Sequence, residues 1–227
     1  MDFKSALIVG VGPGLSASLA RLFAKQGLQV AMASREPDKL AKLAQETAGV
    51  TFACETTEPE EVAALFDVVV ATQGVPDIVV YNASARARGP VTELIPEEVA
   101  HALSVSAYGG FLVAQQAARL MVARGSGAIL LTGASASVKG YPNSSAFAMG
   151  KFALRGLASS LARELAPKGV HVAHFVIDGG IRVAGRPDTD DSTLDPDGVA
   201  QSYLDVLRQP RNAWSLEVEL RPWVETF

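Results

Sequence analysis

The sequence predicts one α/β domain, a three-layer αβα sandwich around a doubly wound parallel sheet that spans residues 1–227. Three observations predict this fold. Short apolar runs alternate with amphipathic stretches from residue 6 to residue 176, the runs are continuously apolar, and a glycine-rich turn joins the first run to the first amphipathic stretch. Continuously apolar strands are typical of a parallel sheet that is buried on both faces.

The expected strands are the short apolar runs. They cover residues 6–9, 30–33, 50–53, 78–81, 128–131 and 170–176. A further segment near the end of the chain, 214–220, alternates between apolar and polar residues as a strand does.

The expected helices follow from apolar residues spaced three or four apart. They cover about 15–23, 40–44, 62–69, 96–124, 146–165 and 198–208, and Gly109 and Gly110 are expected to interrupt the long stretch at 96–124. Thr57-Glu58-Pro59-Glu60 is typical of a capping box. The Asp- and Pro-rich segment 186–197 is expected to be a loop, and residues 182–210 to form a short substrate-covering region.

The composition excludes several classes of protein. The mean hydropathy is +0.21, but no apolar run approaches the ~20 residues that a bilayer requires, so we expect no membrane segment. A net charge of −4 argues against nucleic acid as a partner. The single cysteine, Cys54, is expected to be buried, and no residue spacing indicates a metal site. No signal-like segment begins the chain, which favours a cytoplasmic location.

The glycine turn predicts a dinucleotide site of the Rossmann type. Gly10, Gly12 and Gly14 follow the first strand and precede the first helix. The glycines permit a tight turn and close approach of the backbone to a pyrophosphate, and the helix N-terminus offers free N–H groups to that anion. The alternative is a tight strand–helix turn without a ligand.

The end of the second strand indicates which dinucleotide is bound. An acid there would bind the ribose diol of NAD, but this chain has Ser34 and Arg35 before the first acid, Glu36. A hydroxyl and a guanidinium suit a 2′-phosphate, so NADP(H) is favoured over NAD(H). In the alternative, Arg35 is a solvated charge at a helix start.

Four stretches together resemble the short-chain dehydrogenase/reductase family. Gly10, Gly14 and Ser16 stand at the glycines of its G-x-x-x-G-x-G turn. The other three stretches are Tyr81-Asn82-Ala83-Ser84, similar to N-N-A-G, Phe147-Ala148-Met149-Gly150-Lys151, in the place of Y-x-x-x-K, and Asp178-Gly179-Gly180-Ile181, similar to the P-G turn. The resemblance covers residues 5 to about 181 and implies a nicotinamide-dependent oxidoreductase. It implies cofactor contacts from Gly10, Gly12, Gly14, Leu15, Ser34, Arg35, Glu55, Asn82, Ala83, Lys151, Gly179 and Ile181.

The resemblance also exposes departures at the catalytic positions. Lys151 is retained, but Phe147 stands where the family has its proton-donating Tyr, and Ala134 where it has a Ser. Ser135 is adjacent to Ala134, and Ser106 replaces the family's Asn. Tyr141 or Tyr108 could substitute as an acid, with an aromatic at a loop or interface as the alternative. The catalytic candidates are Lys151, Ser135, Ser106 and Tyr141.

These observations support more than one function. The first is an NADP(H)-dependent oxidoreductase that acts on a small carbonyl or alcohol. The alternative is a catalytically impaired dinucleotide-binding protein, a sensor or a partner subunit; a lyase in the same pocket is a third. Small residues stud the helix at 146–165, and in the resembled family this helix and the one around 104–124 form a subunit interface, so a homodimer or homotetramer is expected.

Overall fold

The computed structural model describes residues 3–183, 185, 188 and 190–225. Its centre is a seven-stranded sheet in the order β3-β2-β1-β4-β5-β6-β7, with every neighbouring pair parallel. The strands are β1 (Ser5–Val9), β2 (Gln29–Ser34), β3 (Val50–Ala53), β4 (Ile78–Tyr81), β5 (Gly127–Thr132), β6 (Val170–Ile177) and β7 (Glu217–Leu220). The predicted doubly wound parallel sheet is therefore confirmed, and its strand order reverses between β1 and β4, where such sheets bind ligands.

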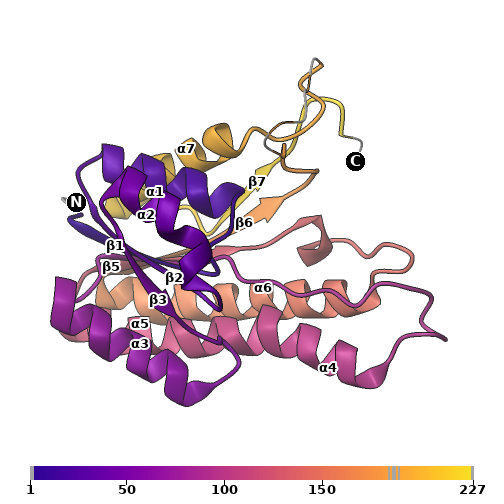
Figure 1. Cartoon of the computed structure of the whole chain (residues 1–227), viewed down its shortest axis with the longest axis horizontal. Coiled ribbons are helices and arrows are strands. Elements are labelled where there is room, and N and C mark those ends of the chain that lie inside the picture. Colours follow the sequence, from indigo (N-terminus) through magenta and orange to yellow (C-terminus); the bar gives the residue numbers. More distant parts are fainter. Residues whose placement is uncertain (1–2, 184, 186–187, 189, 226–227) are drawn as a thin grey trace.

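Helices cover both faces of the sheet (Figure 1). One layer contains α1 (Leu15–Lys25), α2 (Ala41–Thr47) and α7 (Pro196–Leu207). The other contains α3 (Pro59–Gln73), α4 (Pro96–Leu103), α5 (Gly109–Arg124) and α6 (Ser145–Leu165). Because the sheet lies between these layers, its five inner strands are almost entirely buried, whereas the edge strands β3 and β7 are partly exposed.

The strands divide their side chains between two apolar cores. In β1, Ala6 and Ile8 belong to the core beneath α1 and α7, whereas Leu7 and Val9 belong to the core beneath α3, α5 and α6. Successive side chains of a strand point to opposite faces, so a strand that serves both cores has no polar face. This explains why the strands were recognisable as continuous apolar runs.

The long helical stretch is continuous, and the predicted interruption at Gly109 and Gly110 is wrong. A π-helical turn, Ser104–Tyr108, joins α4 directly to α5. A Cβ on Gly109 would lie 2.6 Å from the Tyr81 hydroxyl and 2.8 Å from the Thr56 carbonyl oxygen. Glycine is therefore required here for close packing of the helix on β4, and not to end the helix.

Two further boundaries differ from expectation. The capping box at Thr57 is absent, since α3 begins after Glu58 without a side-chain cap and has Pro59 in its first turn. The Glu61 carboxylate instead accepts a hydrogen bond of 2.7 Å from the backbone N–H of Glu55. The last strand begins at Glu217 and not at Trp214, whose ring stacks on His171 with centroids 4.6 Å apart.

The predicted substrate-covering region divides into two parts. Its helix, α7, packs against α1, and its buried face joins the core of that layer through residues such as Tyr203. Part of the preceding loop, at 184, 186–187 and 189, lies outside the described residues, so the expectation for 186–197 is not tested in full.

Within the described ranges, no helix combines the length and the apolar character that crossing a bilayer requires.

Candidate active site

The glycine turn between β1 and α1 has one crowded and one open glycine. Gly10 has φ +85°, and a Cβ there would lie 2.3 Å from the backbone nitrogen of Ala83. Gly12 has no atom within 4 Å of the position of a Cβ. Gly10 therefore lets two strand ends approach each other, whereas Gly12 leaves open space above the turn.

Asn82 and Ser16 brace this turn. The Asn82 side-chain amide donates to Ser16 Oγ at 2.6 Å, and Ser16 Oγ donates to the Gly10 carbonyl at 3.1 Å. This chain of bonds ties the end of β4 to the first turn of α1. The serine that stands at the family's third glycine is thus a structural link.

A cavity of about 780 Å³ opens beside the turn. It brings together seven of the predicted cofactor residues: Gly10, Gly12, Ser34, Arg35, Glu55, Asn82 and Ala83. Gly14, Leu15, Lys151, Gly179 and Ile181 do not line it, and the Leu15 side chain is buried in the core, so only its backbone could face a ligand.

The cavity suits a dinucleotide in its shape and its charge. Helix α1 begins at Gly14 without a side-chain cap, so its first N–H groups and the positive end of its dipole remain available to an anion. The space beside Gly12 is open to a ligand, and a Cβ at this position would occupy part of it. Cationic side chains from α1, from the segment after β2 and from α2 also line the cavity: Arg21, Arg35, Lys39 and Lys42.

Lys151 is buried at the carboxyl end of β5. Its Nζ donates to the Thr132 carbonyl at 2.7 Å. Burial, reinforced by the charge of Arg86, lowers the pKa of Lys151 to about 7. Near neutral pH a lysine with this pKa can release a proton as the ammonium or accept one as the amine. The Thr132 hydroxyl meanwhile hydrogen bonds to Tyr203 of α7 at 2.9 Å.

The Phe147 ring lies between two cations. The guanidinium carbon of Arg86 is 3.9 Å from the ring centroid, and Lys151 Nζ is 5.8 Å from it. Phe147 and Lys151 are four residues apart in α6 and therefore share one helix face. Sequence reasoning missed Arg86, because nothing in the sequence indicates that its loop folds back onto Phe147.

Ser106 is fully buried in the π-helical turn and holds the loop that follows β4. Its Oγ accepts from the Ala85 N–H and donates to the Ala85 carbonyl, both at 3.3 Å. Its hydroxyl is therefore engaged with the backbone of that loop. We assign Ser106 a positioning role on these contacts.

Ser135 opens a short 3₁₀ turn, Ser135–Ser137, and is half-buried. In the part of the chain that the structure describes, no hydrogen bond engages its hydroxyl, whereas Ser137 Oγ accepts from the Ala134 N–H at 3.1 Å. The Ser135 hydroxyl is thus free to bind a ligand.

The two alternative tyrosines have other partners. Tyr108 is exposed and stacks on Phe111 with centroids 6.2 Å apart. Tyr141 is exposed and lies beside the Lys139 ammonium, which is 5.7 Å from its ring centroid. No recorded contact joins either tyrosine to Phe147 or Lys151 within the described ranges.

Comparisons with known proteins relate this geometry to a family. The family model for short chain dehydrogenases matches residues 4–186. An uncharacterized oxidoreductase of Staphylococcus aureus (strain N315) is 29% identical over 225 residues, which cover 96% of this chain and 97% of that protein. The chain belongs to the short chain dehydrogenase family.

Solved structures show the same fold. A short-chain dehydrogenase from Rhodopseudomonas palustris is 32% identical, with a TM-score of 0.85 and coverage of 97% of this chain and 99% of that chain. A metagenomic short-chain oxidoreductase solved in complex with NADP has a TM-score of 0.85 at 24% identity, with 98% of each chain covered. The predicted oxidoreductase class is confirmed, and the family supports a nicotinamide dinucleotide as cofactor.

A polar network centred on the buried His174 lies behind the site of this dehydrogenase. His174 Nδ1 is 2.9 Å from a Glu217 carboxylate oxygen, and His174 Nε2 is 3.3 Å from Ser137 Oγ. Arg155 donates two bonds of 2.7 Å to the same carboxylate. Burial lowers the pKa of His174, so its ring is neutral at pH 7 and supports the turn that carries Ser135. Sequence reasoning placed His174 in the core or at its rim but missed these partners.

The turn after β6 contains a buried acid where the family has proline. Asp178 forms ion pairs of 3.3 Å with Lys139 and with Arg221. Gly179 has φ +150°, and a Cβ on it would lie 2.7 Å from Pro222. Ile181 forms an isolated bridge with Leu194.

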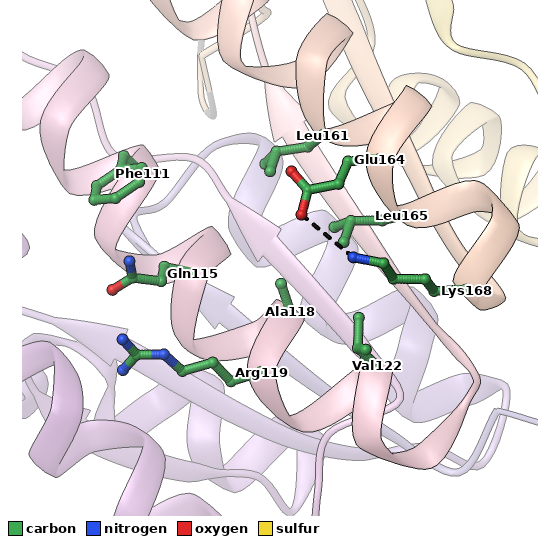
Figure 2. Close-up of a pocket in the computed structure, with 9 residues that line it drawn as sticks. All are labelled: Phe111, Gln115, Ala118, Arg119, Val122, Leu161, Glu164, Leu165 and Lys168. Atoms are coloured by element: carbon green, nitrogen blue, oxygen red, sulfur yellow. Dashed lines mark hydrogen bonds and ion pairs between the residues drawn. The ribbon is translucent and has the colours of Figure 1, made fainter.

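A second hollow, of about 340 Å³, lies between α5 and α6 on the outer face of the molecule (Figure 2). Apolar side chains such as Phe111, Val122 and Leu161 line it, and an ion pair between Glu164 and Lys168 crosses its edge at 3.4 Å. None of the predicted catalytic or cofactor residues lines it. It is therefore separate from the dinucleotide site.

Proposed function

We propose that the protein is an NADP(H)-dependent oxidoreductase that interconverts a small carbonyl compound and its alcohol. The observation that carries this proposal is the pairing of an intact dinucleotide cavity with a buried Lys151 whose pKa is lowered to about 7. The cavity would bind the cofactor, and Lys151 would donate or accept the proton.

The preference for NADP(H) rests on the end of β2. Arg35 and Ser34 line the cavity, and the nearby Glu36 carboxylate is paired with Lys39 Nζ at 2.7 Å. Ser34 Oγ accepts from the Glu36 N–H at 3.2 Å, so its hydroxyl proton remains free to donate to a phosphate oxygen. These donors favour a 2′-phosphate over a ribose diol.

Fluorescence titration tests this preference. The native protein is expected to bind NADPH more tightly than NADH, and Arg35→Gln to lose about tenfold or more of its NADPH affinity while its NADH affinity changes little. Lys25→Gln, which removes an exposed cation at the end of α1, is the matched control. Equal affinities of the native protein for both nucleotides would contradict the proposal.

The proton in this proposal comes from residues other than the missing tyrosine. When bound, the nicotinamide cofactor supplies hydride for the carbonyl carbon, and the carbonyl oxygen must receive a proton. Phe147 has no titratable group. Lys151 would donate that proton, and the free hydroxyl of Ser135 would orient the carbonyl oxygen.

A second candidate function is nucleotide binding without turnover, which Phe147 and Ala134 favour. A screen of carbonyls and alcohols separates the two functions. If the protein is an oxidoreductase, the native protein is expected to turn over at least one of these compounds, and Lys151→Met is expected to abolish that turnover. If only a Phe147→Tyr, Ala134→Ser variant turns over, the native protein is a binder.

The outer face of α5 and α6 is proposed as the interface of a homodimer or homotetramer. Phe111, Met149 and Phe152 are large apolar side chains of α5 and α6 that the isolated chain leaves exposed, and Phe111 also lines the hollow of Figure 2. Light scattering is expected to give a multiple of the chain mass. Phe152→Glu is expected to shift it towards the monomer by placing a charge in the apolar contact.

A further inference from the structure

Arg86 lies at the boundary between the dinucleotide cavity and Phe147. Ala85 lines the cavity, and the guanidinium of the next residue, Arg86, lies 3.9 Å from the Phe147 ring centroid. An aromatic ring holds a guanidinium by its face and leaves the N–H donors at its edge free. Arg86 is exposed, so a ligand can reach these donors.

The backbone on each side of Arg86 is anchored. Ser106 Oγ exchanges two hydrogen bonds of 3.3 Å with Ala85, and Ala87 is buried against Ala102 and Ala146. The guanidinium is therefore presented by a supported loop and an aromatic platform. Such preorganisation reduces the entropy that a binding site loses when its ligand binds.

The cations around Phe147 lack a matching anion. Lys151 Nζ lies 5.8 Å from the ring centroid, and in the described part of the chain no carboxylate forms an ion pair with Arg86. Partial desolvation beside the Phe147 ring and the charge of the neighbouring Arg88 lower the pKa of Arg86. An anion bound beside Arg86 would offset the repulsion between Arg86 and Arg88 and that between Arg86 and Lys151.

We propose that Arg86 binds the carboxylate of the substrate, which is therefore a small keto acid or hydroxy acid. A carboxylate matches the guanidinium edge through two parallel hydrogen bonds. The proposal rests on the proposed oxidoreductase function, since it assigns the substrate class of the same site. Arg86 then determines specificity, while Lys151 remains the residue that exchanges the proton.

The cofactor's own phosphates do not account for Arg86. The glycine turn and Arg35 lie along the dinucleotide cavity, which Arg86 does not line. Arg86 lies over the Phe147 ring, and Phe147 is one helical turn from Lys151 in α6. Arg86 is therefore close to the residue that would exchange the proton.

Matched acid and ester pairs test the proposal on the complex of the full chain with NADPH. Pyruvate is compared with methyl pyruvate, and acetoacetate with methyl acetoacetate, by the change in NADPH fluorescence on binding. At least one acid is expected to bind about tenfold or more tightly than its ester, because only the acid carries the anionic group. This readout does not require turnover.

Three variants locate the effect. Arg86→Gln is expected to abolish the preference for the acid, and Arg86→Lys to retain part of it, since lysine keeps the charge but loses the planar fork. Arg88→Gln removes the same charge two residues further along the loop and is expected to keep the preference. NADPH affinity is expected to be unchanged in all three.

The outcomes separate the substrate class from the proposed function. Equal binding of acids and esters, no binding of either, or a preference that survives in Arg86→Gln would overturn the role of Arg86. Failure of the native protein to bind NADPH would instead overturn the proposed function itself.

Discussion

Lys151 Nζ donates a hydrogen bond of 2.7 Å to the backbone carbonyl of Thr132, and the side chain that carries it is almost completely buried. This carbonyl is a neutral acceptor, and in the described part of the chain no carboxylate forms an ion pair with the ammonium. Among the described residues, the protein thus holds a buried cation without a counter-ion at the carboxyl end of β5. Such an arrangement costs stability and is typical of a functional position.

The first prediction concerns the stability cost of Lys151. Its pKa is lowered to about 7 in the folded protein, so folding releases a proton between about pH 7 and its unfolded value near 10.5. Lys151→Met is expected to raise the free energy of unfolding by about 1–3 kcal/mol at pH 7. The gain is expected to shrink as the pH rises towards 10.5, because the unfolded lysine then also loses its proton.

Urea unfolding of the cofactor-free native and variant proteins at pH 7 and pH 9.5 measures this difference. A variant that is less stable than the native protein at pH 7 would show that the ammonium is well solvated.

The second prediction tests the open glycine of the turn. Gly12→Val places a side chain in free space that belongs to the dinucleotide cavity. We expect NADPH affinity to fall by about tenfold or more, while the free energy of unfolding changes by less than about 1 kcal/mol. Calorimetric titration and urea unfolding measure the two quantities.

Gly156→Val is the matched control, because Gly156 also has no atom within 4 Å of a Cβ but lies in α6. Its NADPH affinity should equal that of the native protein. Unchanged affinity in Gly12→Val would mean that the ligand does not occupy the space above the turn.

The third prediction tests why Gly109 is a glycine. Gly109→Ala would bring a methyl group within 2.6 Å of the Tyr81 hydroxyl, which is buried and donates to the Val105 carbonyl. The crowding is expected to lower the free energy of unfolding by about 1–3 kcal/mol.

Gly156→Ala, another helical glycine, is expected to raise the same quantity by about 0.5–1 kcal/mol, because alanine is the better helix former and nothing opposes its methyl group. Urea unfolding compares the pair. If both variants shifted in the same direction, helix propensity and not packing would govern Gly109.

The fourth prediction concerns the buried His174. Its pKa is lowered by burial, although Glu217 opposes this shift and Lys151 and Arg155 add to it. Because the folded pKa lies below the unfolded one, the stability linked to the neutral ring is present above about pH 6.5. It is lost as the pH falls through the folded pKa.

His174→Gln is expected to cost about 1–3 kcal/mol of unfolding free energy at pH 7.5, since Glu217 and Ser137 lose their partner. The cost is expected to shrink towards pH 5, because the native protein alone must protonate a buried ring. His101→Gln, at an exposed position of α4, should leave the pH dependence unchanged. A cost that is constant from pH 7.5 to pH 5 would exclude His174 as the titrating group.

Much of the fold could be predicted from the sequence because local patterns carry it. Strands β1, β2, β4, β5 and β6 are almost entirely buried, and their apolar runs are therefore visible without knowledge of their neighbours. The glycine turn was predictable for the same reason, since its strand, glycines and helix are contiguous. Gly109 was misjudged because low helix propensity is a local property, whereas its reason, contact with Tyr81, is tertiary.

The candidate site was only partly predictable because its contacts are distant in sequence. Arg86 lies in the loop after β4 and Phe147 lies in α6. Their contact depends on the path of that loop. His174 and Glu217 meet because β6 and β7 are neighbouring strands in register. No spacing along the chain encodes these distances, so the residues around Lys151 emerge only from the structure.

Thr132 carries a further consequence. Its carbonyl holds Lys151 on one side of the sheet, and its hydroxyl hydrogen bonds to Tyr203 of α7 on the other. A substitution that moves Tyr203 would therefore displace the acceptor of the Lys151 ammonium. If Lys151 acts as proposed, the sequence of this distant helix is limited by the position of the ammonium as well as by packing.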